Sequence, residues 1–319
     1  EVKPCSADDS AASLWCESRS SPGFYIKPLQ SLGCGGFSFL TPHSFRPGMG
    51  AAPACHNGDM TMNRDALLSA LGDDARALDV HFFEEIDSTN AYLAANPPAR
   101  DALVVARRQT AGRGRRGRDW QSPPGGIYLS LGRPMAEGAL PSPLLPLAVG
   151  MSVARALSGF GVTEARVKWP NDLVVNGCKI AGILVEKAKN TLIIGIGLNW
   201  ASAPISNLPA DRRAIGLADL IEADAVPSKT VVTAGVVTGL LGILAMDADD
   251  LARHVAEHWP GFDALAGRTV TVEQADGAVI TGVAAGITPE GALRLRTAQG
   301  EQMLHGGETR IQGGWERMA

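Results

Sequence analysis

The stretch GRGRRGRDW, residues 112–120, decides between a folded domain and a low-complexity nucleic-acid-binding chain. With Arg107 and Arg108 it belongs to a cluster of six arginines and three glycines within twelve residues, in a chain whose formal net charge is -4. Glycine lets a backbone approach a ligand closely, and guanidinium groups bind phosphate through paired hydrogen bonds. Strand-like apolar runs at residues 102–106 and 127–131 flank the stretch. We therefore expect a loop of a folded domain that closes over an anion, with a weak RNA-binding patch as the alternative.

Composition places the chain among ordinary globular proteins. Its length of 319 residues is enough for one sizeable domain and a smaller one. The residues are 45% hydrophobic and 19% charged, which is ordinary for a globular protein. No apolar run reaches membrane-spanning length, so we expect no membrane partner. Four of the five cysteines lie within the first sixty residues, at spacings that fit no zinc motif. Because the rest of the chain contains Cys178 alone, it is interpreted as a reduced, cytoplasmic protein.

The first part of the chain differs from the rest. Residues 1–61 are rich in Ser, Gly and Pro and have no sustained helical or strand period. We expect them to form a disordered N-terminal extension. A transit peptide and a disulfide-stapled domain are the alternatives.

Hydrophobic periodicity after residue 62 predicts a domain of mixed helices and strands. Helices are expected at residues 63–71, 91–95, 144–160, 228–245 and 247–258, and strands at residues 80–86, 102–106, 127–131, 165–169, 172–175, 178–186 and 191–199. Residues 268–312 consist of short strand-like runs separated by turns, which is typical of a small antiparallel barrel. The expected boundaries are therefore 62–261 for the larger domain and 262–319 for the barrel.

The Asn-Gly dipeptide at 176–177 predicts a tight hairpin, because both turn positions need positive φ. A two-residue turn places Asp172 and Lys179 on one face of the hairpin. A surface ion pair of little energetic value is the plain alternative. Ala181 and Val185 are expected to continue the same face, where the small side chain of Ala181 leaves room for a ligand.

Five segments, in this order, resemble the motifs of bacterial biotin protein ligases. They are EIDSTN at 85–90, QTAGRGRRGRDW at 109–120, KWPNDL at 168–173, KIAGILVE at 179–186 and GIGLN at 195–199. The resemblance spans residues 63–312. It implies an α+β fold: a class II synthetase-like biotin/lipoate ligase catalytic domain, with a mixed sheet flanked by helices, followed by a C-terminal SH3-like β-barrel. It also implies ATP-dependent attachment of biotin to a carrier lysine through biotinyl-5′-AMP.

The same resemblance implies roles for individual residues. The implied biotin-binding residues are Ser88, Thr89, Asn90, Gln109, Arg113, Gly114, Arg115 and Lys179. The implied nucleotide-binding residues are Arg113, Arg115, Arg116, Trp120, Asn171 and Asn199, with the loop 200–214 near the adenine. The implied catalytic residues are Lys179, Asp172, Arg115 and Lys168. Among these, Asp172 is expected to position or deprotonate the incoming lysine, and the cations to offset phosphate charge. The simpler interpretations are helix capping for Ser88 and Thr89 and core packing for Trp120.

Cofactors and partners follow from the same resemblance. ATP and Mg²⁺ are expected, with no metal ligands identified, and the arginine-rich loop is the candidate to hold the nucleotide because a P-loop is missing. The expected partner is a biotin carboxyl-carrier domain of acetyl-CoA carboxylase or of a related biotin-dependent enzyme. We expect no DNA binding, since residues 1–61 show no paired helices of a helix-turn-helix, and a homodimer is left open. Alternative functions are a lipoate ligase and a non-enzymatic nucleic-acid-binding protein.

Overall fold

The computed structural model describes residues 62–201, 213–312 and Trp315, all of which lie in the unit Ala54–Ala319. The expectations about residues 1–61, including the missing helix-turn-helix, lie outside the described residues. So does the part of the expected adenine-proximal loop at residues 202–212.

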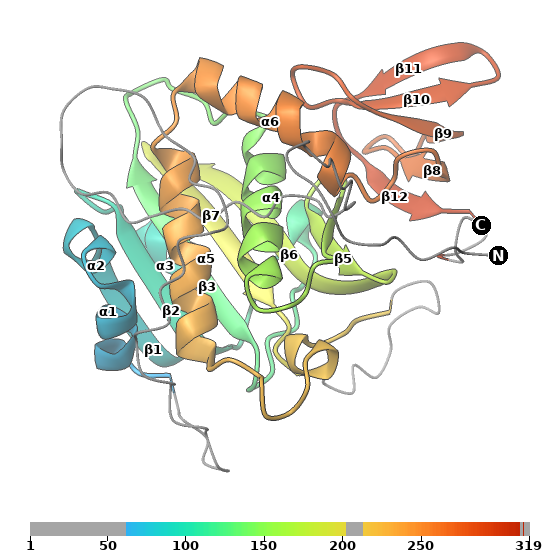
Figure 1. Ribbon diagram of the computed structural model, residues 1–319. Helices are drawn as coiled ribbons and strands as arrows, with labels where there is room; N and C mark the ends of the chain where they lie inside the picture. The colour runs from blue at the N-terminus through green and yellow to red at the C-terminus, as the bar shows by residue number, and fades with distance from the viewer. Residues whose placement is uncertain (1–61, 202–212, 313–314, 316–319) are drawn as a thin grey trace, which may run out of the picture. The chain divides into compact units, whose positions relative to one another are not determined.

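A mixed sheet of seven strands, in the order β1-β2-β3-β7-β6-β5-β4, dominates the larger part of the fold (Figure 1). Strands β1 and β2 run parallel, and the other neighbouring pairs are antiparallel. The strands are β1 (Asp79–Ile86), β2 (Ala102–Gln109), β3 (Ile127–Pro134), β4 (Arg166–Lys168), β5 (Asp172–Val175), β6 (Cys178–Ala188) and β7 (Thr191–Leu198). The mixed sheet predicted for the catalytic domain is therefore confirmed.

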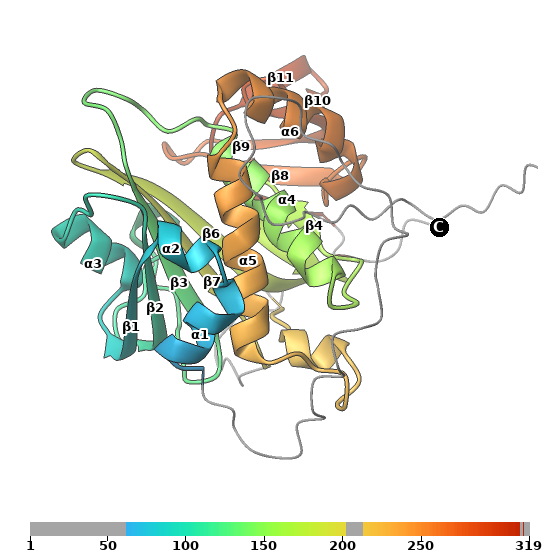
Figure 2. The same cartoon turned by 60° about the vertical axis from the view of Figure 1, so that its left-hand side comes forward.

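Helices cover both faces of this sheet (Figure 2). Along β2, Leu103 and Val105 join the large core beneath α4 and α5, whereas Val104 packs with Leu93 of α3 on the opposite face. Gly132 permits this packing, because a Cβ there would lie 2.9 Å from Leu93 Cδ2. The helices are α1 (Arg64–Leu71), α2 (Asp74–Ala77), α3 (Thr89–Ala95), α4 (Leu145–Ser158), α5 (Lys229–Leu244) and α6 (Ala248–Phe262), with short 3₁₀ turns at η1 (Arg115–Gly117) and η2 (Leu217–Leu220).

Side-chain caps explain where several helices begin. Asn63 accepts a hydrogen bond from the Ala66 N–H at the start of α1, and Asp247 accepts one from the Asp250 N–H at the start of α6. The end of α6 differs from the prediction. The helix passes through Pro260 to Phe262, beyond the predicted end at 258. Proline removes one backbone donor, but the burial of neighbouring Trp259, which is 3% exposed, holds this turn of the helix against the core.

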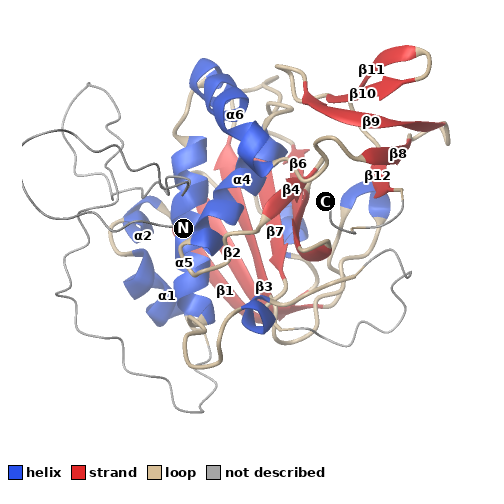
Figure 3. Ribbon diagram, turned by 45° about the vertical axis from the view of Figure 1, so that its right-hand side comes forward, coloured by secondary structure: helices blue, strands red, loops and turns tan. Residues whose placement is uncertain are grey.

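The C-terminal part is a second, antiparallel sheet of five strands in the order β11-β10-β9-β8-β12 (Figure 3). Its strands are β8 (Thr269–Glu273), β9 (Val279–Ile287), β10 (Leu293–Thr297), β11 (Gly300–Leu304) and β12 (Glu308–Ile311). This is the sheet expected of the SH3-like barrel, and we call β8–β12 the C-terminal barrel. Trp169 connects it to the larger sheet: its Nε1–H donates to Gly291 O at 3.0 Å, and its carbonyl accepts from the Thr309 hydroxyl at 2.8 Å.

Candidate functional site

A cavity of about 330 Å³ lies beside the loop between β2 and β3, residues 110–126, which we call the arginine loop. Every residue that was assigned a site role from the sequence lines this cavity. These residues are Ser88, Thr89, Asn90, Gln109, Arg113, Gly114, Arg115, Arg116, Trp120, Lys168, Asn171, Asp172, Lys179 and Asn199. The fold thus gathers side chains from α3, the arginine loop and the neighbouring strands at one place.

Glycines form the part of the cavity where β6 and β7 lie side by side. A Cβ on Gly182 would lie 2.7 Å from the Trp120 ring, and one on Gly197 would lie 2.4 Å from it. A Cβ on Gly195 would lie 2.2 Å from the Asn90 amide oxygen. The three glycines therefore make the space that Trp120 and Asn90 occupy, a role that was not predicted although all three lie in quoted motifs.

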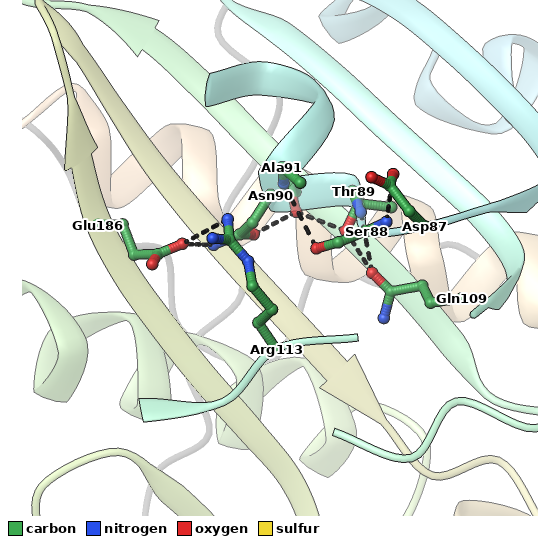
Figure 4. A network of polar contacts seen from close by, with 9 residues as sticks. Asp87, Ser88, Thr89, Asn90, Ala91, Gln109, Arg113 and Glu186 are labelled. Carbon is green, nitrogen blue, oxygen red and sulfur yellow. Dashed lines mark hydrogen bonds and ion pairs between the residues drawn. The ribbon is translucent and has the colours of Figure 1, made fainter. Parts of the chain in front are cut away.

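Buried polar side chains line one end of the cavity. Ser88, Thr89 and Asn90 are 2%, 3% and 4% exposed. The Thr89 N–H and hydroxyl donate to Gln109 Oε1 at 2.9 Å and 3.1 Å (Figure 4). Ser130 Oγ lies 2.7 Å from Thr89 Oγ1 and 2.5 Å from Asn90 Oδ1. A network of this kind fixes donors and acceptors before a ligand arrives.

Ser88 combines the capping position with a place in the cavity. Its Oγ accepts a hydrogen bond from the Ala91 N–H at 3.4 Å, which confirms the predicted helix cap of α3. A hydroxyl that accepts here still has its own proton to donate. Ser130 was missed from the sequence, because a lone serine in an apolar strand carries no motif.

Lys179 and Asp172 form the predicted ion pair. Lys179 Nζ lies 2.7 Å from Asp172 Oδ1, and 5.0 Å from the centre of the Trp120 ring. Asn176 and Gly177 have φ of 49° and 79°, the positive values that the predicted turn requires. The two side chains are 36% and 24% exposed, so the pair is in contact with solvent in the cavity.

The expected alternation beyond the hairpin is wrong, because β6 contains a β-bulge. Lys179 pairs with Val174 as predicted, but Ala181 then pairs with Leu173 and Gly182 with Asp172. The extra residue reverses the side-chain parity. Ala181 is therefore buried in the large core, and Val185 is partly buried against the same core. Gly182, and not Ala181, lies beside the Lys179 side chain.

Contacts distant in sequence hold this bulge. The Lys179 N–H donates to Arg213 O at 2.7 Å, and the Lys179 carbonyl accepts from the Ile215 N–H at 3.0 Å. Asn199 Nδ2 donates to the same carbonyl at 3.1 Å, and the Asn199 N–H donates to Ile180 O at 2.8 Å. Asn199 thus lines the cavity and also fixes the backbone that carries Lys179.

Arg115 interacts electrostatically with Asp172 of the ion pair. One of its guanidinium nitrogens donates to Asn171 Oδ1 at 3.3 Å, while Asn171 Nδ2 donates to Ile183 O at 2.7 Å. Burial, and after it the charge of Arg116, lowers the pKa of the Arg115 guanidinium, and the carboxylate of Asp172 opposes this shift. Arg115 remains a cation at neutral pH and adds positive charge near Asp172.

Two further arginines of the loop contact the C-terminal barrel. Arg118 forms an ion pair with Glu308 of β12, and Arg116, with φ of 59°, lies 3.5 Å from the Glu273 carbonyl of β8. The barrel therefore contributes to the wall of the cavity near Arg116 and Arg118.

Lys168, the last of the predicted site residues, lies opposite Asp172 in the register of β4 and β5.

The Trp120 side chain has a polar atom without a partner: its Nε1–H is buried and has no hydrogen-bond partner among the described residues.

The described residues contain neither a metal-binding cluster nor a membrane-spanning helix. Within residues 62–201 and 213–312, no group of three or more His, Cys, Asp or Glu side chains could hold a metal ion. In the same ranges, none of the helices combines the length and apolarity needed to cross a membrane.

Comparison with known proteins assigns both sheets to the family that the five motifs resemble. Residues 82–200 match the biotin/lipoate A/B protein ligase family, and residues 266–308 match the biotin protein ligase C terminal domain. The bifunctional ligase/repressor BirA of Escherichia coli is 34% identical over 220 residues, which cover 66% of this chain and 67% of that protein. The biotin–[acetyl-CoA-carboxylase] ligase of Paracoccus denitrificans is 40% identical over 127 residues, 37% of this chain and 53% of that protein.

A solved structure agrees with these matches. The biotin protein ligase from Aquifex aeolicus in complex with biotin and ATP superposes with a TM-score of 0.58 at 26% identity, and covers 73% of this chain and 98% of that one. The resemblance predicted from the five motifs is confirmed, and the chain belongs to the biotin protein ligase family.

Proposed function

We propose that this protein attaches biotin to a specific lysine of a carrier domain, with ATP as the second substrate and biotinyl-5′-AMP as the intermediate. The observation that carries the proposal is the Lys179–Asp172 pair beside Arg115 in a cavity covered by an arginine-rich loop. Relatives support it: the Paracoccus denitrificans protein is a biotin–[acetyl-CoA-carboxylase] ligase, and the Aquifex aeolicus ligase was solved with biotin and ATP.

The buried polar end of the cavity is the proposed biotin site. The ureido ring of biotin carries two N–H donors and one carbonyl acceptor, so it needs both acceptors and donors around it. Ser88 has a hydroxyl proton to donate, and Thr89, Asn90 and Gln109 hold oxygen atoms in a fixed network. Arg113 and Gly114 belong to the part of the loop that covers this end.

The first step joins two anions. An oxygen of the biotin carboxylate attacks the α-phosphorus of ATP, the new O–P bond forms, and the bond to pyrophosphate breaks. Lys179 and Arg115, with Lys168 nearby, offset the charge that builds up on the phosphate oxygens. The ion pair with Asp172 keeps the Lys179 ammonium directed into the cavity.

The nucleotide is proposed to lie against Trp120. Its indole offers a stacking surface and a buried Nε1–H without a partner among the described residues. Asn171 and Asn199 line the same region, and Arg113, Arg115 and Arg116 supply phosphate-binding groups. Mg²⁺ is proposed to accompany ATP and to be held mainly through phosphate oxygens, where it neutralises phosphate charge.

The second step transfers biotin to the carrier. The lysine amine attacks the acyl carbon of biotinyl-5′-AMP, an amide bond forms, and AMP leaves with the electrons of the broken C–O bond. Asp172 is the proposed acceptor of the proton that the lysine must lose. The proposed carrier is the domain of acetyl-CoA carboxylase or of a related biotin-dependent enzyme, in the cytoplasm, and a homodimer stays a prediction.

The test is pyrophosphate release by the purified protein with Mg²⁺-ATP, comparing biotin with lipoate, followed by mass spectrometry of a biotin carrier domain. We expect biotin-dependent release and a mass increase of one biotin on one carrier lysine. Pyrophosphate release with lipoate but not with biotin would replace the biotin assignment by the lipoate ligase alternative. Salt-sensitive binding to nucleic acid without any release would instead favour the nucleic-acid-binding alternative.

A further inference from the structure

Glu186 of β6 contacts both the buried polar residues and the arginine loop through one carboxylate oxygen. Its Oε2 accepts a hydrogen bond from Asn90 Nδ2 at 2.7 Å and lies 3.5 Å from Arg113 Nη2 (Figure 4). The bulge in β6 places Gly182 on the cavity side of the sheet, and Glu186, four residues further along the regular strand, points to the same side. Glu186 therefore joins the two parts of the protein that enclose the proposed biotin site.

The contact with Asn90 determines how its amide is oriented. A carboxylate can only accept hydrogen bonds, so the Asn90 NH₂ must face Glu186. The amide oxygen then faces Ser130, whose Oγ lies 2.5 Å away. Gly195 lets the amide lie close against β7, since a Cβ there would lie 2.2 Å from that oxygen. With Asn90 almost wholly buried, the opposite orientation would set two acceptors against each other, which is costly.

The contact with Arg113 reaches the start of the arginine loop. Arg113 pairs with Asp119 in an isolated bridge, and the Gly114 N–H donates to Arg118 O at 2.7 Å, so the loop has its own internal turn. The Arg113 and Glu186 side chains are 45% and 34% exposed, and an ion pair this accessible to water contributes little alone. A loop that has to open for each ligand needs an anchor that breaks easily.

We propose that Glu186 is a positioning residue that holds Arg113 at the mouth of the cavity while fixing Asn90 inside it. The expected consequence is that biotin and biotinyl-5′-AMP leave slowly, because the loop stays closed over an already ordered site. Glu186 acts through Asn90 and Arg113 and not on the reacting atoms, so the chemical steps keep their rate constants. The proposal rests on the proposed function.

Two variants separate the contacts. Glu186→Gln removes the charge but keeps an oxygen that can accept from Asn90, whereas Glu186→Ala removes both. Glu85→Gln is the matched control, because Glu85 forms a 2.6 Å ion pair with Arg108 in which the side chains are 52% and 50% exposed. Enzyme loaded with biotinyl-5′-AMP is chased with excess unlabelled biotin and ATP. We expect release about threefold to tenfold faster for Glu186→Gln, faster still for Glu186→Ala, and unchanged for Glu85→Gln.

A second measurement needs no ligand. Trypsin cleaves after arginine, so the cleavage rate at Arg115 and Arg116 reports how often the loop opens. We expect faster cleavage in both Glu186 variants and the parent rate in Glu85→Gln. Parent-like release and parent-like cleavage would overturn the proposal, as would a slower adenylation step at saturating biotin with release unchanged. A parent protein that binds no biotin would count against the proposed function, and the cleavage rates would still decide whether Glu186 holds the loop.

Discussion

Lys179 Nζ lies 2.7 Å from Asp172 Oδ1 across the β5–β6 hairpin, at the point where a bulge interrupts the register of β6. The pair brings a cation that can stabilise phosphate charge and a carboxylate that can accept a proton into one small volume. These two tasks belong to different steps of the proposed reaction. The two residues should therefore be separable by mutation.

Replacing Lys179 by Ala should abolish adenylation and spare the fold. We expect kcat/KM for biotin-dependent pyrophosphate release to fall by about a hundredfold or more, since a preorganised charge at the transition state is lost. The side chain is 36% exposed, so the melting temperature should change by about 2 °C or less. Lys187→Ala, on the same strand, is the control and should keep full activity. Normal pyrophosphate release by the Lys179 variant would remove this residue from the first step.

Replacing Asp172 by Asn should affect transfer more than adenylation. In single-turnover transfer from isolated biotinyl-5′-AMP, we expect a loss of about a hundredfold at neutral pH, within the range of general-base contributions. The loss should shrink as the pH rises, because more of the carrier lysine is then already neutral. An equal loss in both steps at every pH would show that Asp172 acts only by holding Lys179.

Adding one methyl group to Gly197 should displace Trp120. The new Cβ would lie 2.4 Å from the indole, so the ring has to move or the strands have to separate. We expect Gly197→Ala to weaken ATP affinity about tenfold, roughly 1.4 kcal/mol, with a smaller effect on biotin. Gly261→Ala is the control, because a Cβ there meets nothing within 4 Å. Calorimetric titration of each ligand distinguishes the two sites.

Acidification should destabilise the protein through His254 of α6. Burial, and after it the charges of His258 and Arg155, lowers the pKa of His254 from 6.5 to about 4. Between these values the unfolded chain binds more protons than the folded one, so stability is present above pH 6.5 and falls as the pH drops toward 4. Because the ring is partly solvated, we expect a loss on the order of 1–2 kcal/mol.

Urea unfolding at several pH values measures this loss. His254→Gln should flatten the dependence of the unfolding free energy on pH below 6.5, and the variant of exposed His305, His305→Gln, should keep the slope of the parent. An unchanged slope in His254→Gln would assign the acid sensitivity to other groups.

Local signals predicted most of what depends on neighbouring residues. The Asn-Gly turn, the Asp172–Lys179 pair and the cap at Ser88 follow from a few adjacent side chains, and all are present. The bulge after Lys179 does not, because Arg213 and Ile215 stabilise it from a distant part of the chain. This is why the predicted positions of Ala181 and Val185 were wrong.

Residues outside any sequence motif could not be predicted either, because their roles also depend on contacts with distant parts of the chain. Ser130 is one serine in an apolar strand, and it matters only because Thr89 and Asn90 fold onto it. The helix through Pro260 was also missed, because a proline normally ends a helix and here the burial of Trp259 offsets this tendency. In each case tertiary packing overrides the local preference.

The contacts of the arginine loop with the C-terminal barrel restrict how the protein can change during evolution. Arg118 forms an ion pair with Glu308, and Arg116 contacts the Glu273 carbonyl. The Thr309 hydroxyl donates a hydrogen bond to the Trp169 carbonyl, between β4 and β5. A barrel transplanted from a distant relative would have to bring an acid at the position of Glu308 and a hydroxyl at that of Thr309. We therefore expect substitutions along β12 to be tolerated mainly when the arginine loop changes with them.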